Sequence, residues 1–351
     1  MAKMNSKAAL DNIIKKSRVH LYKPIQIAEI LRHYRLKGDI ADISDFNSYR
    51  NTSKKWRDEI SKQILGRVCT SSQKFQDNLF ESNAMPPKLL KELAEFNNRN
   101  EGIVEAYIYH QLSNRLSMVF EAFEYINKAK PQTFDLDELL KLFISKPGLK
   151  RSIDKVYEII VYALFSTLIR ALKVEITLSI NRANKDILID FEEFVELVLG
   201  LSKKRKSVII PAKLFRLGAT NAADRGLDMY ANFGPAVQVK HITLSEELAE
   251  DVSDNISADK IVLVCLDGEA NVIKKITKQL PFSNRIQGII TLSDLRDWYG
   301  LCFSAKYRKI LGNYLLNDLK TEFLSEFPLT SNIAPFLTER GYKSDNLCLT
   351  K

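Results

Sequence analysis

The sequence predicts an α/β (α+β) fold in which a mixed β-sheet is flanked by helices and preceded by a mainly helical N-terminal region. Up to about residue 200, apolar residues recur at three- and four-residue spacings, which is typical of amphipathic helices. Past residue 206 the chain changes to short β-rich runs bounded by turn residues. From about residue 190 onward the order is helix, three strands, helix, strand, helix, strand. Such an order implies crossovers after the third strand, and therefore a mixed sheet covered by helices.

Several helices separated by Ser, Pro and Gly residues are expected in the N-terminal region. The most apolar run, IIVYALFSTLI (159–169), has eleven residues, which is short of the roughly 20 that span a bilayer. We therefore expect a buried helix there and no membrane partner. The other helices are predicted at 25–35, 54–68, 87–98 and 104–129.

The C-terminal part is expected to hold the sheet. We predict a mainly helical region over 1–205 and an α/β core over 206–351, whose first helix could be 190–201. Two further helices are expected between the later strands, at 245–255 and 271–280. The five strands are predicted at 213–219, 227–233, 236–242, 260–267 and 286–293.

The net charge of +9 over 351 residues is unevenly distributed. Residues 1–70 hold 15 Lys and Arg against 7 Asp and Glu, and 203–216 hold six basic residues and no acid. Concentrated basic charge is the electrostatic footprint of a nucleic-acid binder. Any one cluster taken alone is equally well explained as a solvated surface, but two separated clusters favour a polyanionic partner.

The sequence offers few residues for cysteine-based or nucleotide-dependent chemistry. The four cysteines are scattered without a CxxC pair, as in a reduced cytoplasmic protein, and Cys265 inside IVLVCL reads as a small core residue. The N-terminus lacks the apolar segment of a secretory signal. Neither a GxxxxGK[ST] loop nor a strand-following GxGxxG occurs, so no nucleotide cofactor is expected.

Three polar residues on two successive strands form the candidate site. Gln238 and Lys240 are two residues apart and therefore project from one face of their strand. If 233–235 form a three-residue loop, Asp228 lies opposite Lys240 and all three side chains share that face. A two-residue loop would turn Asp228 to the other face. A shared site therefore requires an odd loop or a bulge.

An acid, an amide oxygen and a lysine on one face suit metal-assisted hydrolysis of a phosphodiester. Carboxylate and carbonyl oxygens are ligands for Mg²⁺, which completes its shell with water and substrate phosphate. The metal lowers the pKa of a bound water, and a lysine can orient that water or stabilise the developing charge. The plain alternative is a cross-strand Asp–Lys pair with no chemical role.

Asp228 followed by Gln238-Val239-Lys240 on the next strand resembles the PD-(D/E)xK nuclease signature, and the element order is similar to that fold. Two longer strings, FRLGATNAADRGLDMYANFGPAVQVKH and YRNTSKKWRDEISKQILGRVCTSSQKFQDNLF, resemble the HaeII-type restriction endonucleases more specifically. The resemblance covers nearly the whole chain. It implies a Mg²⁺-dependent type II restriction endonuclease of the prokaryotic cytoplasm.

Carried over by position, the resemblance makes Asp228 the metal-binding acid, Gln238 the second metal ligand at the (D/E) position and Lys240 the catalytic lysine. Gln238 departs from the pattern because it is a neutral amide where a carboxylate is usual. Another acid could compensate for the lost charge. Asp224 and Glu193 are the candidates, and the sequence does not choose between them.

The resemblance also implies double-stranded DNA as the partner, cut at a short palindrome, which is RGCGCY if specificity follows the name-bearing member. A palindrome is most simply read by a homodimer. Two other functions stay open: a structure-specific or repair nuclease of the same fold, and a non-catalytic basic DNA-binding protein. The candidate DNA-binding residues, for bases or for phosphates, are Arg50, Lys54, Lys55 and Arg57.

Overall fold

The structure, a computed structural model, describes ten stretches of the chain, and the statements below concern these. Its contacts divide the chain into two compact units, of which the first is Met1–Ile159, Gly218–Asp224 and Leu319–Lys351 and the second is Ile160–Leu217 and Arg225–Asp318. The boundary predicted at 205/206 lies inside the second unit. The described residues are 5–38, 46–69, 78–80, 84–180, 185–217, 227–243, 245, 258–268, 285–329 and 332–342.

The first unit is built from helices, as its sequence periodicity predicts. The helix after Asp135 begins where that side chain accepts hydrogen bonds from the backbone of Asp137 and Glu138, a typical N-cap. The four predicted helices at 25–35, 54–68, 87–98 and 104–129 are all present. The helices are α1 (Ser6–Lys16), α2 (Tyr22–Lys37), α3 (Phe46–Leu65), α5 (Pro87–Arg99), α6 (Ile103–Lys128), α7 (Leu136–Ile144) and α15 (Ile333–Glu339).

A buried ionic network connects the helices of this unit. The fully buried Glu105 accepts two hydrogen bonds from Arg35, at 2.9 and 2.8 Å. It also accepts one from Asn97 at 2.6 Å and one from the Tyr342 hydroxyl at 2.6 Å. Because an unpaired buried charge is strongly destabilising, these partners hold α2, α5, α6 and the segment after α15 in one arrangement.

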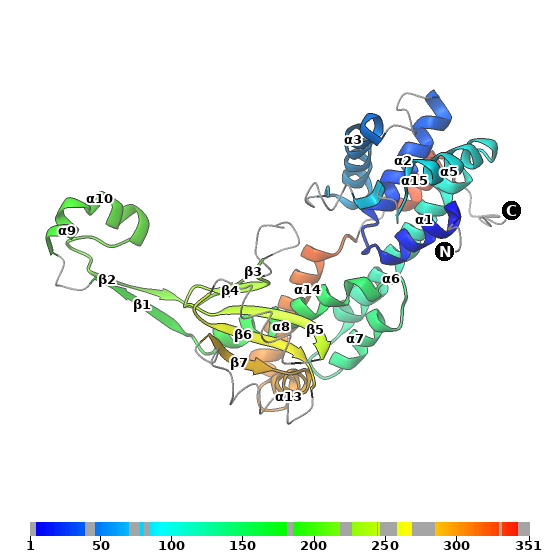
Figure 1. Cartoon of the computed structure of the whole chain (residues 1–351). Coiled ribbons are helices and arrows are strands. Elements are labelled where there is room, and N and C mark those ends of the chain that lie inside the picture. The colour runs from blue at the N-terminus through cyan, green and yellow to red at the C-terminus, as the bar shows by residue number, and fades with distance from the viewer. Residues whose placement is uncertain are drawn as a thin grey trace. The chain divides into compact units, whose positions relative to one another are not determined.

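The second unit contains a five-stranded mixed sheet, with all five strands where the sequence predicts them (Figure 1). The spatial order is β3-β4-β5-β6-β7. The β3–β4 and β4–β5 pairs are antiparallel, and the β5–β6 and β6–β7 pairs are parallel. The strands are β3 (Leu214–Arg216), β4 (Met229–Ala231), β5 (Ala236–Thr243), β6 (Ile261–Leu266) and β7 (Ile286–Ile290).

Two helices of the second unit pack against each other beside the sheet. The predicted buried run forms α8 (Ile153–Ala171), and α13 (Leu292–Phe303) follows β7 with a capping box between Thr291 and Asp294. The Tyr299 hydroxyl of α13 donates to the Ile160 carbonyl of α8 at 2.9 Å. The predicted helices at 246–255 and 271–280 lie outside the described residues, as does the expected end of the first strand at 218–219.

The part of the second unit that the sequence does not predict is an arm over residues 175–211. Strands β1 (Glu175–Ser179) and β2 (Ser207–Pro211) pair as an antiparallel ribbon. At its far end lie α9 (Lys185–Asp190), α10 (Glu192–Phe194) and a π-helical turn over Val195–Leu199 (Figure 1). The stretch 190–201, suggested as the first helix of the catalytic core, is thus divided near Phe191 and packs within the arm.

Candidate active site on the central sheet

The turn between β4 and β5 has the odd length that a shared face requires. Ala231 N–H donates to the Pro235 carbonyl at 2.9 Å, so the loop is Asn232, Phe233 and Gly234. Gly234 has φ +120, a conformation that favours glycine. The predicted loop was 233–235, so the register is displaced by one residue on each strand.

The displaced register brings Asp228 opposite Gln238 and not opposite Lys240. Met229 pairs with Val237, and one step further along the same register Asp228 meets Gln238. The Gln238 Nε2 amide donates to Asp228 Oδ2 at 2.6 Å. The same oxygen accepts the Val239 backbone N–H at 2.8 Å. Two donors therefore fix the carboxylate in place at the end of β4.

On β4, the face that carries the site is the more exposed of the two. Along β4, Met229 and Ala231 are buried while Tyr230 is 42% exposed. Asp228 is two residues from Tyr230 and shares its face, since side chains alternate along a strand. The Tyr230 ring stacks on Phe215 of β3, with centroids 5.1 Å apart. An exposed aromatic pair therefore lies beside Asp228 on the same face.

The other side-chain atom of Gln238 is the most informative feature of the site. Gln238 is only 2% exposed. Because a carboxylate accepts but does not donate, the amide nitrogen must face Asp228 and Oε1 must point elsewhere. This buried Oε1 has no hydrogen-bond partner among the described residues. A buried acceptor without a partner costs about 1–3 kcal/mol, so its retention calls for an explanation.

Lys240 lies on β5 two residues beyond Gln238 and is half-buried. Alternation along a regular strand gives it the face of Gln238. The register with β6 is regular as far as Val239 and shifts before Thr243. Lys240 therefore stands where the irregularity begins, and such irregularities can redirect a side chain.

Asp228 and Gln238 fit a hard divalent cation through a carboxylate and an amide oxygen. The unpartnered Oε1 is the atom that such an ion would satisfy. Within the described residues, no group of three or more His, Cys, Asp and Glu side chains is placed to hold a metal. Of the two acids considered as compensation, Glu193 lies exposed on α10 of the arm, and Asp224 is outside the described residues.

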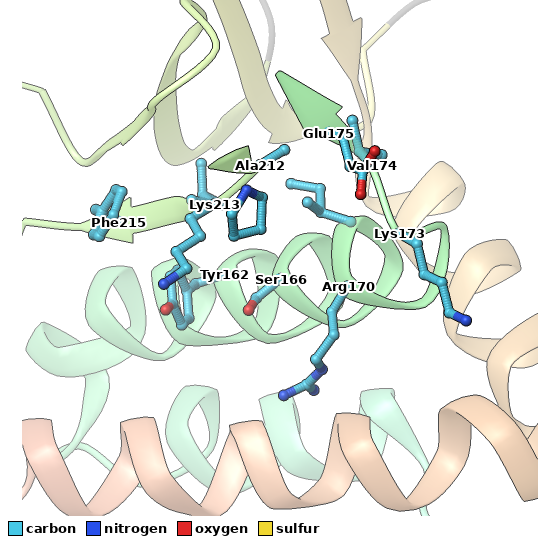
Figure 2. Close-up of a pocket in the computed structure, with 12 residues that line it drawn as sticks. Tyr162, Ser166, Arg170, Lys173, Val174, Glu175, Ala212, Lys213 and Phe215 are labelled. Atoms are coloured by element: carbon cyan, nitrogen blue, oxygen red, sulfur yellow. The ribbon is translucent and has the colours of Figure 1, made fainter. Parts of the chain in front are cut away.

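A separate pocket of about 550 Å³ lies between α8 and the segment around β2 and β3 (Figure 2). Three cations line it, Arg170, Lys173 and Lys213, against one acid, Glu175. Phe215 belongs to this lining and also stacks on Tyr230. Arg170 is already ion-paired with Asp318, at 2.8 Å. Phe215 connects the pocket to the face that carries Asp228.

The cysteines are not candidates for a nucleophile in the described part of the chain. Cys265 is fully buried in β6, as predicted, and burial raises the pKa of its thiol to about 11. Burial likewise raises the pKa of the Cys302 thiol to about 11. Because the thiolate is the reactive form, neither is poised for attack at neutral pH.

The predicted DNA-binding residues all lie on α3 but differ in exposure. Lys55 is exposed, and Lys54 and Arg50 are half-buried. Arg57 is 2% exposed, lies 2.7 Å from Asp58 and donates to the buried Gln26. This burial favours a structural role for Arg57. The other three stay predictions for contact with DNA.

The structure gives the fold class, a mixed sheet with a mainly helical N-terminal region, and comparison with known proteins gives the family. The family model for the HaeII restriction endonuclease matches residues 6–342. This chain belongs to the HaeII restriction endonuclease family, and is by that membership a site-specific restriction endonuclease. No solved structure matches it.

Two relatives match over nearly their whole length. The type II restriction enzyme NgoBI of Neisseria gonorrhoeae is 47% identical over 345 residues, 97% of each chain. The type II restriction enzyme HaeII of Haemophilus aegyptius is 48% identical over 339 residues, 96% of each chain. The family generally implies a divalent metal cofactor and DNA as the partner. No helix in the described residues is long and apolar enough to cross a membrane.

Proposed function

We propose that this chain is a Mg²⁺-dependent type II restriction endonuclease that hydrolyses phosphodiester bonds of double-stranded DNA at a short palindrome, with Asp228, Gln238 and Lys240 as its catalytic residues. The observation that carries the assignment is the side chain of Gln238, whose Nε2 donates to the Asp228 carboxylate while its buried Oε1 is unpartnered among the described residues. Family membership gives the class of enzyme, and this geometry supports the choice of residues.

Asp228 and Gln238 are the residues that would hold the metal. When bound there, Mg²⁺ would lower the pKa of a coordinated water and neutralise charge on the scissile phosphate. Asp228 supplies a full negative charge, and its two hydrogen bonds keep the carboxylate oriented before substrate arrives. Gln238 supplies a neutral oxygen, so the protein charge at this site is lower than with the usual pair of carboxylates.

Lys240 acts on the reacting groups in this proposal. Its ammonium group binds the attacking water or the phosphate oxygen on which charge develops, and both contacts are strongest in the transition state. The half-buried position of Lys240 favours this role, because electrostatic interactions weaken when the charges are fully solvated.

Family membership supports the substrate and the assembly that we propose. We propose that two copies act together as a homodimer, since a palindrome presents the same bases to two symmetry-related subunits. RGCGCY is the recognition sequence that we expect, and the prokaryotic cytoplasm is the compartment. The exposed Lys55 and its neighbour Lys54 are proposed to contact DNA phosphates.

The test is cleavage of two plasmids that differ only in whether RGCGCY is present, with Mg²⁺ and with EDTA. We expect discrete fragments from the first plasmid with Mg²⁺ alone, and fragment ends that all sequence to one position in RGCGCY. Discrete fragments with other ends would refute the recognition sequence only. Cleavage confined to flaps or junctions would indicate a repair nuclease. Binding without cleavage under any divalent ion would indicate a non-catalytic DNA-binding protein.

A further inference from the structure

The head of the arm, residues 180–206, exposes far more apolar surface than it buries within its described part. Its own small core is Leu188, Val195 and Leu201, with Ile180 and Val208 packed against them. Six large apolar side chains remain more than half exposed, namely Ile187 (59%), Ile189 (53%), Phe191 (59%), Phe194 (54%), Leu197 (78%) and Val198 (62%).

Single apolar residues on a surface are ordinary, but a contiguous group of them marks an interaction site. These six lie within twelve consecutive residues, 187–198, on α9, α10 and the π-helical turn (Figure 1). The ribbon of β1 and β2 also has an exposed apolar residue at Ile209 (61%). Seven exposed apolar side chains in this short part of the chain are more than the single exposed residues that need no explanation.

The charges of the head have a self-complementary pattern. Over 185–199 there are five acids and one lysine, which gives a net charge of −4. The next stretch, 203–206, is Lys-Lys-Arg-Lys, with a net charge of +4. These cations are exposed, and one of them, Lys203, lies 2.8 Å from Glu192. The same acid–base contact can therefore form between two heads as well as within one.

We propose that two copies of this chain associate through their arm heads. The exposed apolar residues of one head pack against those of the other. The acidic stretch 185–199 of each copy faces the basic stretch 203–206 of the other. A two-fold contact uses the same patch on both subunits, so that patch must complement itself. The head meets this condition because it carries an acidic stretch, a basic stretch and an exposed apolar group. The choice of a second copy as partner rests on the proposed function, because cutting both DNA strands requires two sites.

DNA is a less suitable occupant of this surface. The stretch that carries the apolar residues has a net charge of −4 and would be repelled by phosphates. Aromatic and aliphatic side chains without interspersed cations also lack the donors that phosphate contacts use. The basic stretch 203–206 alone suits DNA, so contact with DNA is an outcome that the experiments must separate.

The first experiment measures mass in solution without DNA, by sedimentation velocity on the full chain. We expect twice the chain mass of 40.2 kDa. The double variant Leu197→Glu/Val198→Glu, at two highly exposed positions, is expected to sediment as a monomer with unchanged circular dichroism. Leu301→Glu on α13, at a leucine that is 55% exposed, is the matched control and should stay dimeric. A monomeric parent, or a dimeric double variant, overturns the proposal.

The second experiment uses charge neutralisation. Glu193→Lys/Glu196→Lys brings the net charge of the acidic stretch from −4 to 0, and Lys204→Glu/Arg205→Glu brings that of the basic stretch from +4 to 0. Each variant alone is expected to dimerise more weakly than the parent, because both contacts of its homodimer lose their attraction. An equimolar mixture is expected to dimerise more tightly than either variant alone, since the heterodimer keeps one contact between an unchanged acidic stretch and an unchanged basic stretch. Parent-like dimers of either variant alone, or no gain on mixing, contradict the proposed contact.

DNA cleavage separates this inference from the proposed function. Loss of dimers in Leu197→Glu/Val198→Glu is decided without DNA, so it stands even if the parent cuts nothing. If the parent cuts and the variant remains dimeric, the inference fails and the nuclease assignment stands. If the variant remains dimeric and only its DNA affinity falls, the head contacts DNA instead. With both correct, the variant should lose double-strand cleavage at least tenfold relative to the parent.

Discussion

The Gln238 amide nitrogen donates to Asp228 Oδ2 across the β4–β5 pair, and this one contact orients the whole side chain. Because the nitrogen faces the carboxylate, the amide oxygen is directed away from Asp228 and stays buried without a partner among the described residues. In a nuclease that carries a carboxylate at this position, two acids repel each other until a metal binds between them. In this chain a hydrogen bond already connects Gln238 and Asp228 before a metal binds.

Replacing Gln238 therefore has different effects with and without metal. Gln238→Glu places a second carboxylate against Asp228 Oδ2, and two acids at such a separation disfavour the doubly charged state. We expect a lower unfolding temperature in EDTA and a larger stabilisation by Mg²⁺ than in the parent. Thermal unfolding with EDTA and with Mg²⁺ measures both effects.

Gln238→Leu is the matched variant, since it keeps the volume of the side chain and removes both amide atoms. It should lose the Mg²⁺ response and most cleavage. The cost of leaving Asp228 with one donor fewer is about 1–3 kcal/mol of unfolding free energy. An unchanged Mg²⁺ response in Gln238→Leu would show that the amide oxygen is not a ligand.

Asp228 can be tested by a change that preserves its hydrogen bonds. Asp228→Asn keeps an oxygen to accept from Gln238 Nε2 and the Val239 N–H but removes the charge. We expect cleavage to fall at least a hundredfold, and DNA binding to become independent of Mg²⁺. Gel shifts with and without the metal give the second result. Mg²⁺-dependent binding that survives in this variant would place the metal elsewhere.

The sheet was more predictable than what surrounds it. Runs such as KIVLVCLD carry β-branched residues between turn residues, and all five strands form where expected. An odd loop was predicted at 233–235 from the need for Asp228, Gln238 and Lys240 to share a face, and the loop observed at 232–234 is also odd. Its register differs because the chain turns at Asn232, whose side chain accepts the Lys213 N–H and donates to the Pro211 carbonyl. Such contacts between separate segments are not visible in a local pattern.

The arm was not predictable from periodicity. The stretch 190–201 has apolar residues at helical spacings, which indicates that one face needs cover but not what covers it. We interpreted this stretch as a possible first helix of the core, whereas in the described residues its buried side chains Val195 and Leu201 pack within the arm. Likewise, Arg57 belongs to a basic stretch in the sequence, and its burial beside Gln26 depends on how α2 and α3 pack. The aromatic pair Phe215 and Tyr230 became evident only from the register of β3 and β4.

Lys54 and Lys55 are expected to contribute to DNA binding through phosphates. Changing both to Gln should weaken binding and lower the slope of log affinity against log salt by about 1.8, at roughly 0.9 per phosphate contact. Lys128→Gln/Lys141→Gln removes the same charge from two lysine side chains that are 76% and 70% exposed, and is the control. If both double variants lower the slope equally, Lys54 and Lys55 affect DNA binding only through the net charge of the protein and not through phosphate contacts of their own.

The stability of the chain should fall in mild acid because of His20. Burial lowers the pKa of His20 from 6.5 to about 4, and its ring stacks on Tyr22. The unfolded chain therefore takes up this proton first as the pH falls. The stability contributed by the neutral ring is present above about pH 6.5 and is lost towards pH 4. Between pH 7 and 5 the loss is on the order of 2 kcal/mol.

His20→Phe retains an aromatic ring that does not titrate. Its unfolding free energy in urea should decline less between pH 7 and 5 than that of the parent. His110→Gln, which removes an imidazole whose Nε2 lies 3.2 Å from the Tyr342 carbonyl oxygen, is the control and should keep the parent's pH dependence. Equal pH dependence in His20→Phe and the parent would show that His20 is not the group responsible.

The most direct test of the proposed site is the comparison of binding and cleavage in Lys240→Ala. The lysine is proposed to act on the attacking water or on the developing charge, interactions that strengthen only in the transition state. Gel-shift affinity for RGCGCY DNA should therefore remain within a few-fold of the parent, while Mg²⁺-dependent cleavage falls at least a hundredfold. Circular dichroism establishes that the variant is folded. A well-folded Lys240→Ala that cuts within tenfold of the parent rate would contradict the assignment of this site.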